Sequence, residues 1–254
     1  GDEVLVAEDQ RDTVSSVHDD ANNAMADRPR VAVCVSGSMR SADNVFTHNL
    51  DLLRSLGDVD VFVYTPDDSM AAKALLLRPR ALVVAPDTRL NETGTPSGFY
   101  RRDRDALQRY LQQAHGMSKC YKLLSAASGG IEYDWVVRYR ADVTVVLGAG
   151  LEMQQLDPTV VHTPAKWRDK IFTEEHINDV FAVGKAELMR HYFEVWDDCI
   201  FNNAQPYRDK WNRWLCESML KFCLDARNVT AVEHPEWQAT VVRQTGTCST
   251  SACH

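Results

Sequence analysis

The sequence predicts an α/β fold, with a mainly parallel β-sheet flanked by helices and a mixed α/β second half. Three short apolar runs favour the sheet, at residues 31–35, 60–64 and 80–85. Strands that are buried on both faces of a parallel sheet read as continuous apolar segments. Helical patterns over 43–56 and 69–77 separate these runs. This alternation of strand and helix is typical of βαβ units, in which the strands lie parallel.

The later elements extend this arrangement less regularly. A long helix is predicted over 102–128, and Gly129 and Gly130 end it. A fourth strand is expected over 133–140. The second half is predicted to contain strands over 159–163, 179–184, 229–232 and 240–242, and helices over 185–200 and 207–227. We expect a single domain over 31–243, followed by a tail over 244–254.

Residues 1–30 are predicted to be a flexible acidic stem. They contain eight acids and three bases and show no sustained apolar periodicity. Val4, Leu5 and Val6 are the residues through which this segment would pack if it were ordered. Because the chain begins with Gly rather than Met, we expect that a segment containing a membrane anchor preceded it. The membrane would then be a partner only through that anchor.

Composition and charge disfavour several classes of protein and of partner. The 254 residues have a net charge of −8, most of it in the stem, so no global basic field suggests a nucleic-acid partner. No apolar run approaches the ~18 residues that a membrane-spanning helix needs. Seven cysteines form no CxxC pair, which disfavours a zinc ribbon. With two N-glycosylation sequons they favour the secretory lumen weakly, and the cytoplasm remains the alternative.

The first candidate site follows the first strand directly, at Ser36, Gly37, Ser38 and Arg40. Ligands of open α/β sheets bind at the carboxyl ends of strands. A turn of small residues there presents backbone N–H groups to an anion, and Arg40 adds a bidentate phosphate donor. The alternative is a tight strand-to-helix turn with a solvated arginine. Neither GxGxxG nor GxxxxGK[ST] is present, which disfavours an ordinary Rossmann dehydrogenase or P-loop enzyme.

The second candidate site lies where the fourth strand ends. Arg138 and Arg140 are two residues apart and therefore share one face of a strand. Asp142 follows at the exit, where a carboxylate can bind Mn²⁺ or Mg²⁺ that bridges a diphosphate. The alternative is an edge strand with paired surface charges. A single aspartate would need phosphate oxygens to complete the metal site.

Five further residues are candidates for binding or catalysis. Lys119 and Tyr121 lie on the long helix in a locally basic stretch that would attract an anionic donor, although such a stretch is usually a solvated face. Asp179 and Glu217 are candidates for a general base, with a strand cap and an ion-paired surface charge as their alternatives. His234 is a candidate late metal ligand, and its alternative is a lone surface histidine.

Four segments together resemble a family of small glycosyltransferase-like proteins with a GT-A-type fold. Residues 31–40 resemble its opening hxhCxSGxxR pattern, where h is apolar and x is any residue. Residues 117–122 are similar to its mid-chain helix. Residues 133–142 resemble its YDxhhRxRxD strand, and residues 178–184 its NDxFxhG segment. Each match is short, but their order and spacing over residues 31–225 are more specific than any one of them.

The resemblance implies transfer of a sugar from a nucleotide-diphosphate donor to a hydroxyl of a glycan or glycoprotein. It places the donor in the half over 31–150, with Arg138, Arg140 and Asp142 facing the diphosphate, and the acceptor in the half over 151–243. Asp142 takes the place of the last acid of an Asp-x-Asp motif, and Arg140 replaces the first, which weakens the expectation of a metal. It also implies a Golgi or secretory-pathway location. The alternatives are a catalytically inactive glycan-binding or chaperone-like homologue and a nucleotide-sugar hydrolase.

Overall fold

The computed structural model describes residues 3–6, 28–86, 90, 104–148, 153–165, 176–200 and 216–242. The described strands are β1 Glu3–Val6, β2 Arg30–Ser36, β3 Asp58–Pro66, β4 Ala81–Ala85, β5 Trp135–Tyr139, β6 Val143–Val146, β7 Val161–Pro164, β8 Phe181–Gly184, β9 Ala231–His234 and β10 Gln238–Val241. Eight of them form one sheet in the order β1-β4-β3-β2-β5-β8-β7-β9. The neighbours β4, β3, β2 and β5 pair in parallel, while β8 is antiparallel to β5 and β7. The predicted α/β class with a mainly parallel sheet is therefore confirmed.

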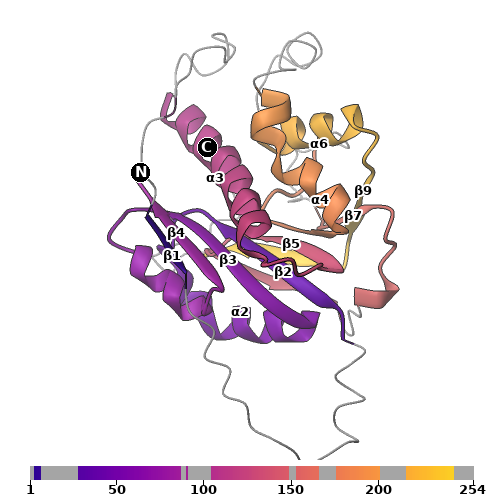
Figure 1. The fold of residues 1–254 in the computed structure, drawn as a ribbon. Coiled ribbons are helices and arrows are strands. Elements are labelled where there is room, and N and C mark those ends of the chain that lie inside the picture. The colour runs from indigo at the N-terminus through magenta and orange to yellow at the C-terminus, as the bar shows by residue number, and fades with distance from the viewer. Residues whose placement is uncertain are drawn as a thin grey trace, which may run out of the picture.

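The helices lie on both faces of this sheet. They are α2 Ala42–Leu56, α3 Arg104–Ala127, α4 Ala186–Phe193 and α6 Cys216–Ala226, with two 3₁₀ segments, η1 Ala71–Leu77 and η2 Met153–Gln155, and a π-helical turn, η3 Trp196–Ile200. Helix α2 covers one face of the sheet, and α3, α4 and α6 cover the other (Figure 1). The helix predicted over 69–77 is a 3₁₀ segment, and the one predicted over 185–200 is divided into α4 and η3. The predicted helix over 207–227 is described from residue 216 onward.

Strand β2 contributes to a hydrophobic core on each face of the sheet. Side chains alternate across a strand, so Val31, Val33 and Val35 pack with α2, whereas Ala32 and Cys34 pack with α3. All five are buried, which explains the uninterrupted apolar run in the sequence.

Two disulfides tie helices into this framework. Cys34 of β2 bonds to Cys120 of α3, and Cys199 of η3 bonds to Cys223 of α6. Both join elements that are far apart in the sequence, and the pairing was left open by the sequence. Cys248 and Cys253 lie outside the described residues.

The amino-terminal residues differ from the prediction of a stem. Residues Glu3–Val6 form β1, which pairs antiparallel with β4 at one edge of the sheet, and Arg30 already belongs to β2. The prediction of a flexible segment is therefore wrong for these residues. Their backbone forms hydrogen bonds with the edge of β4 that would otherwise be unpaired.

Residues 7–27 and the tail over 244–254 lie outside the described part of the chain. No helix in the described ranges is long and apolar enough to cross a lipid bilayer.

Removal of β1 tests its contribution to the sheet. We expect a chain that starts at Ala26 to have a lower melting temperature, because the outer edge of β4 loses its hydrogen-bonded neighbour. Each 1 kcal/mol of lost stability lowers the melting temperature by about 2–4 °C in a domain of this size. Leu5→Pro, which removes the N–H of one paired residue, should cause a loss in the same direction. An unchanged melting temperature in both variants, measured by calorimetry, would show that β1 does not support the sheet.

Candidate functional site

The carboxyl ends of β2 and β5 lie next to each other in the sheet. Val35 is paired with Tyr139, so the loops after both strands begin at the same edge. The approach to β8 reaches this edge as well, because the N–H of Arg140 donates to the carbonyl of Val180 over 3.1 Å. Three of the predicted segments, at 36–40, 138–142 and 178–180, therefore meet at the edge where open α/β sheets bind ligands.

Two arginines hold the carboxylate of Asp142 at this edge. Arg140 donates from Nε to Oδ1 over 2.9 Å and from Nη2 to Oδ2 over 3.0 Å. Arg40, from the loop after β2, donates from Nη2 to Oδ2 over 2.8 Å. The Asp142 side chain is buried, whereas that of Arg40 is 40% exposed. The cluster therefore has a buried anion at its centre and a guanidinium that faces solvent.

The charge state of Asp142 follows from this geometry. Burial alone raises the pKa of its carboxyl, but the charges and hydrogen bonds of Arg140 and Arg40 outweigh burial and lower the pKa to about 2. The turn that carries Asp142 is also held firmly. The Tyr139 hydroxyl donates to the carbonyl of Val143 over 2.6 Å, and the N–H of Val242 donates to the carbonyl of Asp142 over 2.8 Å. Asp142 is therefore an ionised anchor for both arginines, on a turn that is hydrogen-bonded on both sides.

In the loop after β2, some of the groups that the sequence predicts to bind an anion already form hydrogen bonds within the protein. Gly37 has a φ of +119°, a value that favours glycine, and its N–H donates to the carbonyl of Tyr64 over 3.2 Å. The Ser38 hydroxyl donates to Asp68 over 2.8 Å. The Ser36 hydroxyl is buried and has no hydrogen-bond partner within the described part of the chain. In this loop, Arg40 is thus the group best placed to meet an anion.

Arg138 lies in the protein interior rather than at the surface of the site. Its side chain is fully buried on the face of β5 that packs against α3, and Nη1 donates to the carbonyls of Tyr139 and Ser36 over 2.7 and 3.4 Å. Burial lowers its pKa to about 10, so it remains charged at neutral pH. The prediction that Arg138 faces the donor diphosphate does not fit this position. Arg138 instead braces the ends of β2 and β5 against each other.

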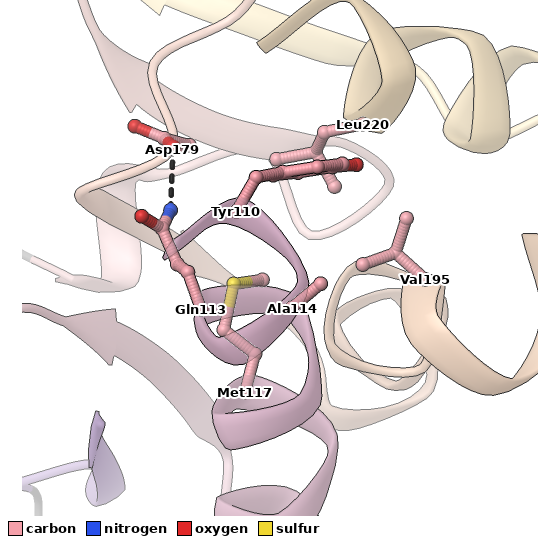
Figure 2. Close-up of a pocket in the computed structure, with 7 residues that line it drawn as sticks. All are labelled: Tyr110, Gln113, Ala114, Met117, Asp179, Val195 and Leu220. Atoms are coloured by element: carbon pink, nitrogen blue, oxygen red, sulfur yellow. Dashed lines mark hydrogen bonds between the residues drawn. The ribbon is translucent and has the colours of Figure 1, made fainter. Parts of the chain in front are cut away.

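The two candidate bases of the second half lie in one buried region. The carboxylate of Asp179 accepts a hydrogen bond from Nε2 of Gln113 over 2.5 Å (Figure 2). Glu217 is buried in the first turn of α6, and its carbonyl accepts from the N–H of Ile177 over 3.4 Å. The hydroxyl of the buried Tyr192 donates to the carbonyl of Asn178 over 3.2 Å. Burial raises the pKa of Tyr192, and both carboxylates raise it further.

Asp179 also lines a small cavity, together with side chains of the helices that cover it. It is partly open, has a volume of about 10 Å³, and is lined by Tyr110, Gln113, Ala114, Met117, Asp179, Val195 and Leu220. Four of these project from one face of α3, while Val195 and Leu220 close the opposite side (Figure 2). This space fits about one water molecule and is far too small for a sugar.

Gln113 was not identified from the sequence. It belongs to an i, i+3, i+4, i+7 series with Tyr110, Ala114 and Met117, which is the signal of a buried helix face. That spacing does not reveal that the face lies opposite Asp179, which is 66 residues later in the chain.

Lys119 and Tyr121 are not brought together with the arginines. The Tyr121 hydroxyl donates to the carbonyl of Ala186 over 3.3 Å, and its ring stacks on Phe193 at a centroid distance of 5.4 Å. Ala186 begins α4 near the opposite edge of the sheet, so Tyr121 has a packing role. Lys119 is half-buried on α3, and within the described residues no hydrogen bond or ion pair joins it to Arg40 or Asp142.

His234 lies away from Asp142, at the end of β9. Two strands separate β9 from β5, a span of roughly 14 Å at the usual spacing between strands. Its ring nitrogens lie 2.8 Å from His162 Nδ1 and 3.1 Å from a Glu236 oxygen, and its ring stacks on Trp237 at 4.1 Å. His234 thus connects His162 of β7 to the turn that follows β9.

The residues at Asp142 do not fit a divalent cation. Both carboxylate oxygens already accept hydrogen bonds from guanidinium groups, whose positive charge would repel a metal ion. Within the described ranges, no group of three or more His, Cys, Asp and Glu residues could hold a metal ion. The metal site with Asp142 and His234 therefore stays a prediction from the sequence.

The comparisons with known proteins concern the fold. No protein-family model matches the chain, and no curated protein matches its sequence. Among solved structures, it is similar to the galactosyltransferase LgtC in complex with donor and acceptor sugar analogs, with a TM-score of 0.44 and 10% identity over 80% of this chain and 73% of that one. It is also similar to the glycosyltransferase GlyE of Streptococcus pneumoniae TIGR4, with a TM-score of 0.38 and 13% identity over 80% of this chain and 46% of that one. At these values the likenesses do not assign a family or an activity.

Substitution of Asp142 tests the charge cluster. The lowered pKa of its carboxyl contributes stability that is present above pH ~4 and is lost as the pH falls toward 2, worth roughly 2 kcal/mol. We expect Asp142→Asn to reduce the free energy of unfolding at pH 7 by about 2–4 kcal/mol, because two guanidinium groups lose their shared anion. The difference from the wild type should shrink between pH 4 and pH 2 in urea titrations.

An exposed ion pair provides the control for this test. Asp51 and Arg54 are 3.7 Å apart, and both side chains are more than two-thirds exposed. Asp51→Asn should change stability by no more than about 0.5 kcal/mol. Equal losses in the two variants would contradict the assigned role of Asp142.

Proposed function

We propose that this protein is a glycosyltransferase that binds a nucleotide-diphosphate sugar at the carboxyl edge of its sheet. The sugar is transferred to a hydroxyl group of a glycan or glycoprotein. The observation that carries the proposal is the cluster of Arg40, Asp142 and Arg140, which presents guanidinium groups at the place where α/β sheets bind ligands. Three of the four sequence segments that resemble GT-A-type glycosyltransferases, at 31–40, 133–142 and 178–184, meet at this edge and support the same site.

The cluster is suited to a diphosphate. Two guanidinium groups share one carboxylate, which leaves an excess positive charge beside the half-exposed Arg40. Arginine binds phosphate oxygens in a bidentate geometry, and Asp142 holds both side chains in place before the donor arrives. When the bond between the sugar and the diphosphate breaks, negative charge grows on the leaving oxygen. Fixed positive groups stabilise that charge without reorganising.

The same arginines take the role that a cation has in many transferases. Arg140 stands where the resemblance implies the first acid of an Asp-x-Asp motif, and it pairs with Asp142. We therefore propose that positive charge from the protein neutralises the leaving diphosphate, and that activity does not require Mn²⁺ or Mg²⁺.

The acceptor side is assigned to the second half of the chain. Asp179 or Glu217 would remove the proton of the attacking hydroxyl if the reaction inverts configuration. Asp179 is favoured because it lies two positions before β8, next to Val180, which pairs with Arg140, and because Gln113 orients its carboxylate. Since the cavity beside Asp179 holds only about one water molecule, the acceptor would enter through a rearrangement of the surrounding side chains.

The proposed compartment is the lumen of the Golgi or another part of the secretory pathway. The disulfides Cys34–Cys120 and Cys199–Cys223 support this assignment, because disulfides persist mainly in oxidising compartments.

Donor binding tests the proposal directly. A panel of nucleotide sugars should include one that raises the melting temperature, both with Mn²⁺ and with EDTA. We expect Arg40→Ala to weaken the binding of that donor by about tenfold to a hundredfold, equivalent to the ~1.5–3 kcal/mol of a charge-assisted contact. Arg54→Ala removes an exposed arginine of α2 and serves as the matched control.

The outcomes separate the alternatives. Transfer to an added glycan acceptor would support the proposed enzyme. Release of nucleoside diphosphate without an acceptor would instead indicate a nucleotide-sugar hydrolase, and donor binding without turnover would indicate an inactive homologue. If no nucleotide sugar binds, or if Arg40→Ala binds as the wild type does, the proposed site is wrong.

Amide substitutions test the proposed base. We expect Asp179→Asn to reduce turnover by ~10²-fold or more while the donor still binds, because the amide cannot accept the proton. Glu217→Gln should have the smaller effect. Asp225→Asn, at an exposed position of α6 that pairs with Lys221, is the control for a neutralised carboxylate. Normal turnover in both Asp179→Asn and Glu217→Gln would place the base elsewhere or indicate a retaining reaction.

A further inference from the structure

The turn after α6 presents an asparagine side chain to solvent. Asn228 has a φ of 56°, in the left-handed region that asparagine tolerates better than most residues. Its N–H donates to the carbonyl of Asp225 over 3.0 Å, and the N–H of Val229 donates to that of Leu224 over 2.9 Å. These backbone hydrogen bonds cap the carboxyl end of the helix, and the side chain of Asn228 takes no part in them. The Asn228 side chain is exposed and makes no hydrogen bond within the described part of the chain.

The residues that follow complete an acceptor sequence for N-glycosylation. Asn228-Val229-Thr230 has the pattern Asn-x-Thr, and x is not proline. Val229 is buried, while the side chains of Asn228 and Thr230 are on the surface. The pattern by itself occurs by chance in many chains. Here the buried side chain of Val229 holds the turn against the protein, and the side chain of Asn228, with its amide group, is exposed to solvent.

Within the described part of the chain, the strand that begins after this turn lies at an edge of the sheet and has no second strand beside it. β9 is the last strand of the eight-stranded sheet and pairs only with β7 among the described strands. Val232 in β9 is 39% exposed. An edge of this kind can pair with another chain, and proteins usually cover or charge such edges. Only two residues separate Asn228 from the start of β9, so a bulky hydrophilic group on its side chain would lie beside this edge.

We propose that Asn228 carries an N-linked glycan, and that this glycan protects the open edge of β9 from pairing with a second copy of the chain. The modification joins the side-chain nitrogen of Asn228 to an oligosaccharide from a lipid-diphosphate donor, which leaves as the lipid diphosphate while the amide loses a proton. The inference rests on the lumenal compartment proposed above, not on the transferase activity.

The test is secretion of the chain from a eukaryotic cell behind a signal peptide. Peptide N-glycosidase F should increase the gel mobility of the protein and convert Asn228 to Asp, as peptide mass spectrometry would show. Asn228→Gly preserves the left-handed turn and should abolish the modification. Thr230→Val should also abolish it, whereas Thr230→Ser keeps the acceptor pattern and should retain it.

The protective role has its own readout. Size-exclusion chromatography with light scattering should show more dimer or larger species for Asn228→Gly and Thr230→Val than for the wild type and Thr230→Ser. An unmodified Asn228 in the secreted wild type would overturn the site. Full modification of the wild type and Thr230→Ser, together with identical association of all four proteins, would overturn the protective role. Neither readout depends on a transferase activity of this protein, so a chain that is glycosylated at Asn228 but inactive would reject the proposed enzyme and support this inference.

Discussion

A buried guanidinium holds the two central strands together at the point where both of them end. Arg138 donates to the carbonyls that close β2 and β5, and these two strands carry the loops with Arg40 and Asp142. A charge without access to water is costly unless it is compensated. Here Asp179 and Asp142 offset part of the cost, while Arg140 adds to it. The position of the candidate site therefore depends on a residue that does not reach its surface.

Asp142 converts this framework into a site with a defined charge. Without its carboxylate, Arg40 and Arg140 would repel each other across the strand ends. With it, they are held in fixed positions and still leave an excess positive charge. The low pKa of Asp142 means that this arrangement persists at any physiological pH. The same geometry that suits a phosphate group makes a cation unfavourable there.

Helix α3 connects the two halves of the proposed site. Its disulfide from Cys120 to Cys34 attaches it to β2, and Gly116 packs against Ser36 at the strand end. One turn earlier, Gln113 reaches the carboxylate of Asp179. A displacement of this helix would therefore affect the arginine cluster and the candidate base together.

The sequence by itself determined the central strands of the sheet and the segments at its carboxyl edge, but not β1, which lies in the segment predicted to be a flexible stem. Apolar runs such as 31–35 predict buried strands because both of their faces must leave water, and polar residues directly after them mark the strand ends. Only the tertiary structure decided what those polar residues contact. Arg138 and Arg140 share a predicted strand, yet one is enclosed under α3 and the other reaches Asp142, because β5 ends between them. The pairing of β1 with β4, the link from Gln113 to Asp179 and both disulfides join residues that are far apart in the chain. Local patterns carry no information about such contacts, which form only when the helices pack on the finished sheet.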